Sequence, residues 1–165
     1  MILNSEIVRE YYAILNPNSK KVVLGVLLSA IGTGMTLSLL LVYLHDMRGF
    51  TNTFGGFLLS FGAAVSLLTG GPVGYLIDRI GPKKVMIAGL ICNSAAAFSL
   101  SLVETHFHAI LALTFINISA QAVWPSQSVI LTRVTPEVDR PKIFGFNFML
   151  LNLGLGMGGL LSSLI

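Results

Sequence analysis

The stretch that decides the fold is GYLIDRIGPKK, residues 74–84. It gathers an aspartate, an arginine and two lysines, and it stands between two stretches without any charged residue, 49–77 and 85–103. Each flanking stretch is long enough for a membrane-spanning helix, which needs about 20 apolar residues. The charged stretch is therefore predicted to be a short loop at the membrane surface, joining two spans.

Three more charge-free stretches predict three more spans. The five predicted helices cover approximately residues 22–44, 54–77, 85–103, 108–132 and 143–165. The composition agrees, since 54% of the 165 residues are hydrophobic and 10% are charged, where soluble domains carry about 25% charged residues. With a single cysteine, Cys92, a disulfide scaffold is also excluded. The expected fold class is an all-α membrane protein with five transmembrane helices.

The basic residues predict the orientation of these helices. Lys and Arg residues are retained on the cytoplasmic side of a membrane. With alternating spans, Arg48 alone falls on one side, and the other side collects Arg9, Lys20, Lys21, Arg79, Lys83, Lys84, Arg133, Arg140 and Lys142. The protein is therefore expected in the plasma (inner) membrane with its N-terminus in the cytoplasm. Because these residues are spread over three loops, they do not indicate a nucleic-acid partner.

The N-terminal residues 1–21 are predicted to form a separate cytoplasmic segment. Leu3, Ile7, Tyr11 and Ile14 recur at helical spacing. A short amphipathic helix lying on the membrane surface has this pattern. Residues 22–165 then make up the transmembrane part.

Small residues mark two of the spans as packing helices. Gly70 and Gly74 in the second span form a Gly-x-x-x-Gly pair, as do Gly154 and Gly158 in the fifth. Small side chains let helix backbones approach each other closely in lipid. These faces are interpreted either as fixed packing surfaces or as smooth surfaces along which helices slide.

The fourth span carries a polar face. Asn117, Gln121 and Trp124 are four and three residues apart, so they share one side of a helix. Together with Thr33 and Thr36 of the first span they are the candidate residues of a substrate cavity. Hydrogen bonding between helices is the alternative interpretation of the polar face.

The loop at residues 74–84 resembles the signature loop of the major facilitator superfamily. The residues that carry the resemblance are Gly74, Asp78, Arg79, Gly81, Lys83 and Lys84. In that family the loop follows the second span and acts as a conformational latch against the second half of the transporter. Weaker similarity, in Trp124-Pro125-Ser126, Pro136 and Asp139-Arg140, points to the efflux-type branch.

The resemblance implies part of a twelve-helix fold made of two six-helix halves. The five spans would be a partial N-terminal half. The expected function is that of a truncated secondary transporter whose parent protein moves a small molecule by alternating access, in the direction of efflux. Its expected partners are membrane lipid, the substrate, and the missing C-terminal half or partner helices. The alternative is a non-transporting regulatory or assembly protein on the same scaffold.

Catalysis, a cofactor and a bound metal are not expected. The spans contain neither a pair of aspartates nor a His-Glu-x-x-His motif, and the sequence shows no convincing serine–histidine pair. Intramembrane proteases and metalloenzymes depend on such groups.

Overall fold

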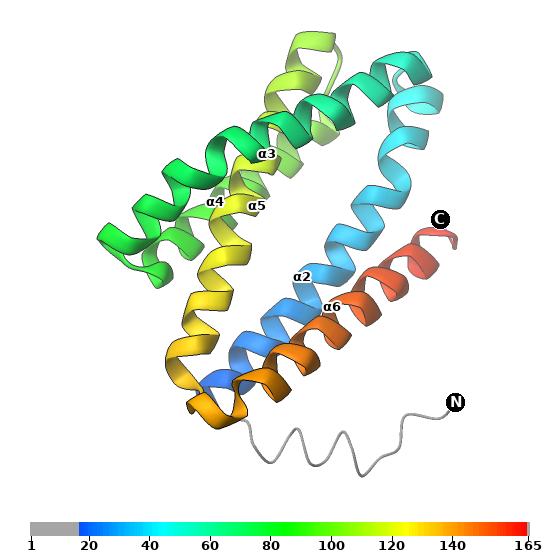
Figure 1. Cartoon of the computed structure of the whole chain (residues 1–165). Coiled ribbons are helices and arrows are strands. Elements are labelled where there is room, and N and C mark those ends of the chain that lie inside the picture. Colours follow the sequence, from blue (N-terminus) through cyan, green and yellow to red (C-terminus); the bar gives the residue numbers. More distant parts are fainter. Residues whose placement is uncertain (1–16, 165) are drawn as a thin grey trace. The chain divides into compact units, whose positions relative to one another are not determined.

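The computed structural model describes residues 17–164, and these residues form five long helices (Figure 1). The helices are α2 Pro17–Val42, α3 Asn52–Ile80, α4 Pro82–Ser101, α5 His106–Val134 and α6 Arg140–Ser162. All five are long and apolar enough to cross a membrane. This confirms the predicted all-α fold of five spans. The predicted surface helix within residues 1–21 has its apolar stripe outside the described residues.

Several helices extend beyond their predicted ends. Helix α2 begins at Pro17, five residues before the predicted start, so Lys20 and Lys21 lie inside the helix. Helix α3 runs to Ile80 and α4 begins at Pro82. Pro17 and Pro82 can each begin a helix because proline fits the first turn, where its missing N–H would have no partner. Charged residues that were expected in loops therefore occupy helix ends.

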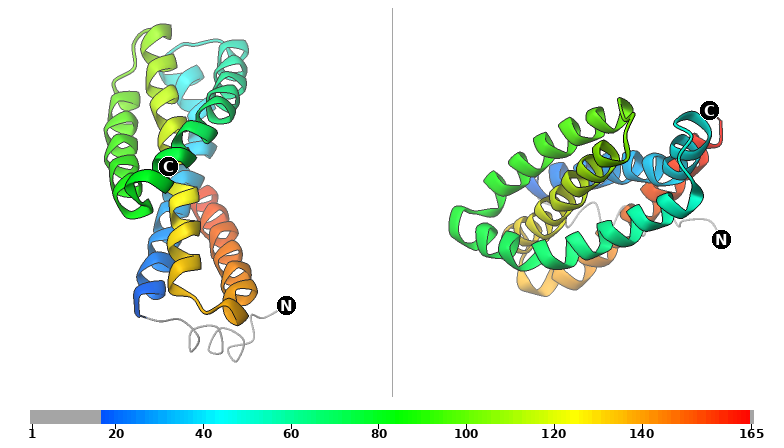
Figure 2. Two further views of the ribbon diagram at one scale, coloured as in Figure 1. Left: turned by 60° about the vertical axis from the view of Figure 1, so that its left-hand side comes forward. Right: turned by 90° about the horizontal axis from the view of Figure 1, so that it is seen from above.

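The chain divides into two compact units, which we describe separately. Unit 1 consists of Met1–Leu40 with Leu131–Ile165, and unit 2 consists of Leu41–Ile130. In unit 1, α2 and α6 lie side by side and run in the same direction (Figures 1 and 2). The core of this unit is a cluster of Val23, Leu131, Ile143 and Phe146.

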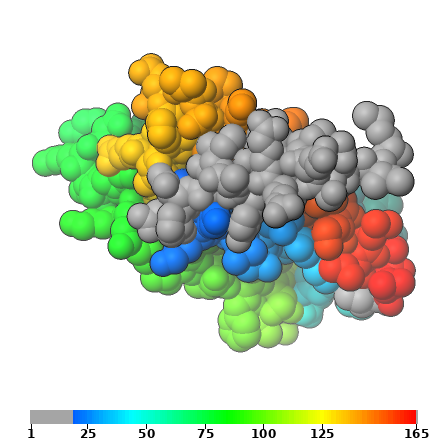
Figure 3. All heavy atoms as spheres, turned by 90° about the horizontal axis from the view of Figure 1, so that it is seen from below, coloured from blue at the N-terminus to red at the C-terminus, as the bar shows by residue number. Residues whose placement is uncertain are grey.

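A short surface connection leads into α6 in unit 1. It contains a 3₁₀ turn, η2 Glu137–Asp139, followed directly by Arg140. Glu137 and Val138 are exposed, and this gold-to-orange part of the chain lies at the surface in Figure 3. The Arg140 guanidinium lies 3.8 Å from the Glu137 carboxylate, so an ion pair spans the turn.

Unit 2 contains α3, α4 and most of α5. Helices α3 and α4 are antiparallel because a single residue, Gly81, joins them. Ile77 of α3, Val85 of α4 and Ala122 of α5 meet in one buried cluster. A π-helical turn, η1 Tyr43–Met47, ends the first span and leads into α3.

Candidate functional site

The turn between α3 and α4 depends on Gly81. Its backbone has a φ of 92° and a ψ of 146°, a region that residues with a side chain rarely adopt. The N–H of Gly81 donates to the carbonyl of Ile77 over 3.0 Å, and its own carbonyl accepts from the N–H of Val85 over 3.3 Å. One residue thus ends α3 and starts α4, which produces a tight turn.

An apolar cluster supports this turn from the inside of unit 2. Val73 and Val129 pack against the buried side chains of Ile77, Val85 and Ala122. The cluster joins the end of α3, the start of α4 and the middle of α5. The turn is therefore anchored by three helices and not by its own charged residues.

The charged residues of the signature loop all face outward from unit 2. Asp78, Arg79, Lys83 and Lys84 are exposed. Within the residues that the structure describes, neither Asp78 nor Arg79 takes part in an ion pair. The turn presents a negative and three positive charges above a cluster packed from three helices.

Gly74, one helical turn before Asp78, lies half-buried on α3. A Cβ atom built on Gly74 would meet nothing within 4 Å, and the same holds for Gly56 near the start of α3. Within the described residues, close contacts of α3 are made instead by Gly55 and Gly62. Gly74 and Gly56 thus take no part in packing inside unit 2, whereas Gly70 contacts Gln121 of α5.

The polar face of α5 is turned toward α3. The Ser66 hydroxyl donates to the Asn117 side-chain oxygen over 3.2 Å, while the Asn117 amide nitrogen donates to the Leu113 carbonyl over 2.8 Å. The Gln121 side-chain oxygen lies 3.6 Å from where a Cβ on Gly70 would stand. Asn117 therefore makes the interhelical hydrogen bond that was one of the two interpretations of this face.

Trp124 and the two threonines differ from Asn117 in their surroundings. Trp124 is half-buried in unit 2, two helical turns along α5 from Asn117. In unit 1, the Thr33 and Thr36 hydroxyls donate to the carbonyls of Ser29 and Gly32, each over 2.9 Å. Thr36 is exposed and Thr33 half-buried. The candidate cavity residues of α5 thus lie in unit 2, and those of α2 lie in unit 1.

Glycines form the contact between α2 and α6 in unit 1. A Cβ on Gly154 would lie 2.6 Å from the Cβ of Ala30, and one on Gly158 would meet the carbonyl oxygen of Ile31. Gly34 of α2 approaches the Leu155 backbone in the same way. Both helices contribute glycine, so their backbones come into direct contact.

At the other end of unit 2, Tyr43 and Arg48 form a polar clasp, which is a set of hydrogen bonds to the end of α4. The sequence did not predict it. The Tyr43 hydroxyl donates to the carbonyls of Leu100 and Ser101 over 3.0 and 2.9 Å. Arg48 donates from Nε to the Tyr43 hydroxyl over 2.7 Å and from its terminal nitrogen to the Ser101 carbonyl. These bonds satisfy carbonyls at the C-terminal end of α4, which have no partner inside the helix.

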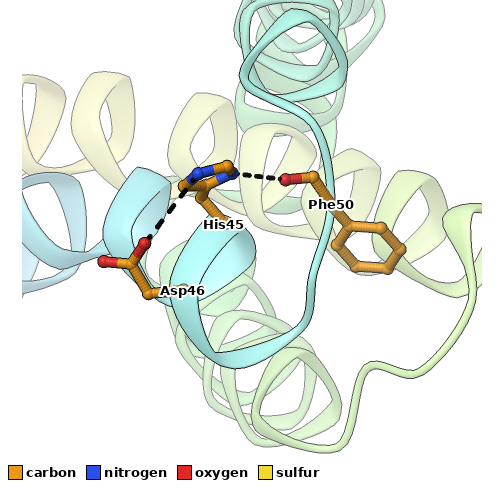
Figure 4. A network of polar contacts seen from close by, with 3 residues as sticks. All are labelled: His45, Asp46 and Phe50. Atoms are coloured by element: carbon orange, nitrogen blue, oxygen red, sulfur yellow. Dashed lines mark hydrogen bonds and ion pairs between the residues drawn. The ribbon is translucent and has the colours of Figure 1, made fainter.

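The π-turn positions this clasp. The Arg48 N–H donates to the Tyr43 carbonyl five residues earlier, over 3.2 Å. In the loop that follows, His45 Nδ1 donates to the Phe50 carbonyl over 2.8 Å, and His45 Nε2 lies 4.0 Å from the Asp46 carboxylate (Figure 4). Composition and periodicity do not predict that this helix ends in a π-helical turn.

A serine and a histidine that the sequence did not single out lie within hydrogen-bonding distance of each other. Ser99 Oγ lies 2.7 Å from His108 Nε2. The antiparallel arrangement of α4 and α5 brings these residues together across their short connection. No carboxylate contacts His108 in the described part of the chain, whereas a catalytic triad uses one to orient the imidazole. In the structure the pair links α4 to the first turn of α5.

Comparison with known proteins finds one matching family model and several similar proteins. The family model of the Major Facilitator Superfamily matches residues 22–165. A quinolone resistance protein, NorA of Staphylococcus aureus (strain MRSA252), is 28% identical over 136 residues, which are 80% of this chain and 35% of NorA. The uncharacterized MFS-type transporter YqjV of Bacillus subtilis (strain 168) is 20% identical over 89% of this chain and 36% of its own length. The chain thus spans about a third of these relatives.

Proposed function

This chain belongs to the Major Facilitator Superfamily, and from that premise we propose that it is part of a secondary transporter that moves a small molecule by alternating access. The observation that carries the proposal is the α3–α4 turn, which packs on an apolar cluster and exposes its charges. Export is the proposed direction, supported by the similarity to a quinolone resistance protein.

The transport unit contains more than these five helices in this proposal. The relatives are about three times longer than the matched part, and alternating access requires two halves around one site. The remaining helices are supplied by the same polypeptide or by a partner. The helices lie in the plasma (inner) membrane with the α3–α4 turn in the cytoplasm, as the distribution of lysine and arginine favours.

The α3–α4 turn acts as the conformational latch in this proposal. Exposed charges on a turn that three helices anchor are suited to pair with a surface outside unit 2, since the backbone that carries them is already ordered. Asp78 supplies the negative charge, and Arg79, Lys83 and Lys84 contact the partner surface or anionic headgroups. Gly74 keeps the adjoining face of α3 free of side chains, so that a second surface can approach it.

The first experiment replaces Asp78 by Asn in the complete transporter. We expect transport to fall at least tenfold, because an exposed latch charge is lost while the apolar cluster under the turn is retained. Thermal stability should change little. Glu104→Gln is the matched control, since Glu104 is an exposed carboxylate in the α4–α5 connection.

The accessibility of introduced cysteines on both membrane faces reports the conformational equilibrium in the same variants. Asp78→Asn should shift this accessibility, and Glu104→Gln should not. Unchanged transport together with unchanged accessibility in Asp78→Asn would contradict the latch.

The polar face of α5 is proposed to contact the substrate through Gln121 and Trp124, and α2 contributes Thr33 and Thr36. Asn117 is proposed to support this face while it binds Ser66.

Gln121→Ala and Trp124→Phe should raise the KM for transport several-fold with little change in Tm. Ser66→Ala is the control for packing, since it removes the bond to Asn117 and should lower Tm without changing substrate preference. An unaltered KM in both α5 variants would remove these residues from the site.

A further inference from the structure

The connection between the first span and α3 contains a histidine with an acceptor at each ring nitrogen. His45 lies in the π-helical turn, and its Nδ1 is 2.8 Å from the Phe50 carbonyl oxygen, while its Nε2 is 4.0 Å from the Asp46 carboxylate (Figure 4). We propose that His45 is a pH switch, which holds the connection at Phe50 when its imidazole is protonated and loosens it when the imidazole is neutral.

Only a protonated ring suits both acceptors. A neutral imidazole carries one N–H, and its other nitrogen is an acceptor. If neutral His45 donates from Nδ1 to the Phe50 carbonyl, the lone pair of Nε2 is left on the side of the Asp46 carboxylate, and the two negative groups repel each other. A protonated ring donates from Nδ1 and places its second N–H on the side of Asp46. Protonation therefore strengthens the contacts of His45 in the connection.

The place of His45 at the end of a helix also favours the charged ring. The first span ends in the π-helical turn Tyr43–Met47, and the C-terminal end of a helix carries a partial negative charge. Histidine changes charge between about pH 5 and pH 8. Because these contacts favour the protonated ring, the stability that they add is present at the acidic end of this range and is lost as the pH rises through it.

Phe50 transmits the effect to α3 and α5, since its ring packs among other rings. Phe50 is 5% exposed, and the centre of its ring lies 5.3 Å from that of Phe54 in α3 and 4.7 Å from that of His106 in α5. The Phe50 N–H also donates to the Leu44 carbonyl over 2.9 Å. The His45–Phe50 bond is thus a contact that depends on pH in a connection otherwise held by ring packing and backbone hydrogen bonds.

The helices around the connection bring few other charges to it. Residues 49–77 and 85–103 contain no charged residue. Arg48 is engaged in the polar clasp at the end of α4, and Glu104 is exposed in the connection before α5. Among the described residues, Asp46 is the carboxylate that pairs with His45.

The two other histidines at this end of unit 2 lack the features of His45. His106 begins α5, where the partial positive charge of a helix N-terminus disfavours a protonated ring. His108 contacts the Ser99 hydroxyl. A hydroxyl can donate or accept, so this bond forms in either charge state of His108.

Hydrogen–deuterium exchange of the purified full chain in detergent tests the switch. Exchange of the backbone amides of residues 44–54 is measured by mass spectrometry at pH 5.5 and pH 8.0 and corrected for the intrinsic effect of pH on exchange. Exposed ion pairs change an equilibrium by up to about fivefold, so the corrected protection should be about threefold higher at pH 5.5. Residues 110–120 of α5 should show no such difference. Equal corrected protection of residues 44–54 at the two pH values would overturn the proposal.

His45→Asn separates the charge from the hydrogen bond. The asparagine amide can still donate to the Phe50 carbonyl but has no charge at either pH, so this variant should lose the threefold difference. Asp46→Asn should reduce the difference, because the carboxylate that favours the charged ring is removed. A difference that persists unchanged in His45→Asn would count against the switch. The comparison of pH values in the unmodified chain needs no variant, so it holds even where a substitution disturbs folding.

His106 and His108 provide the matched controls. His106→Phe keeps an aromatic ring beside Phe50 and Phe54, and His108→Gln keeps a polar partner for Ser99. Both variants should retain the difference between the two pH values, and its loss in either one would overturn the assignment to His45. Transport assays are independent of these measurements, so a negative result here leaves the proposed function to be judged by the Asp78 and Gln121 variants.

Discussion

At the scale of single residues, Gly81 and Gly74 play different parts although both belong to the signature loop. Gly81 has a positive φ of 92°, so its lack of a side chain is required by the backbone itself. Gly74 has ordinary helical geometry and open space around its Cβ position. Its small size matters only if another surface approaches α3.

Gly81→Ala is expected to destabilise the protein by about 1–3 kcal/mol, the usual cost of holding such a backbone conformation with a side chain. Thermal unfolding in detergent measures this effect. Gly74→Ala is the matched variant and should leave stability unchanged or raise it, since alanine favours helices. A Tm of Gly81→Ala equal to that of the parent would argue against the turn geometry.

The Arg48–Tyr43 clasp is a second feature decided by single side chains. Four hydrogen bonds from these two residues reach α4 or join the pair, and the guanidinium also lies 5.3 Å from the centre of the Tyr43 ring. Together they attach the end of the first span to the end of α4.

Arg48→Gln should lower the free energy of unfolding by about 1 kcal/mol, because the Ser101 carbonyl and the Tyr43 hydroxyl lose a charged donor. Tyr43→Phe should have a similar effect, and the double variant should cost less than the sum of both, since the residues share one network. Chemical denaturation of the three variants checks this. Strict additivity would show that the two residues act independently.

At the scale of helices, each unit contains a parallel pair in which glycine allows close approach. In unit 1, Gly154 and Gly158 of α6 contact the backbone of α2. In unit 2, Gly62 of α3 faces Asn117 of α5. Close packing replaces hydrophobic burial as the attraction between helices in lipid. The contact in unit 1 is between backbones, so it tolerates no added atom.

Gly158→Ala should therefore destabilise the α2–α6 pair by about 1–3 kcal/mol, the range for overpacked cores. The new methyl group would meet the Ile31 carbonyl and, at 2.8 Å, the Met35 backbone nitrogen. Gly156→Ala, on the same helix, is the control, because nothing lies within 4 Å of its Cβ position. The difference in Tm between the two variants is the measurement, and similar values would contradict the packing.

At the scale of the whole molecule, the distribution of charge predicts how the chain crosses the membrane. Reporter fusions test it. A cytoplasmic reporter should be active when fused within residues 79–84 and silent when fused within residues 47–51, because the first region carries three basic residues and the second one only Arg48. The reverse pattern would overturn the topology and, with it, the cytoplasmic latch.

The sequence was sufficient for the five spans and the family. Charge is so costly inside a bilayer that its absence over about 20 residues predicts each helix. The boundaries were less predictable, since Pro17 and Pro82 begin helices and Gly81 alone makes a turn. Helix propensity does not predict which neighbouring groups contact the end of a helix.

Only the tertiary structure decided which polar and small residues meet. Asn117 binds Ser66, 51 residues away in sequence, and Ser99 binds His108 across a turn. The groove lined by Leu24, Leu27, Phe146 and Leu150 exists because α6 lies beside α2. Hydropathy is a property of each segment and can be read along the chain, whereas contacts between faces depend on how helices rotate about their axes. In lipid that rotation is set by close packing, which becomes visible only when the neighbours are in place.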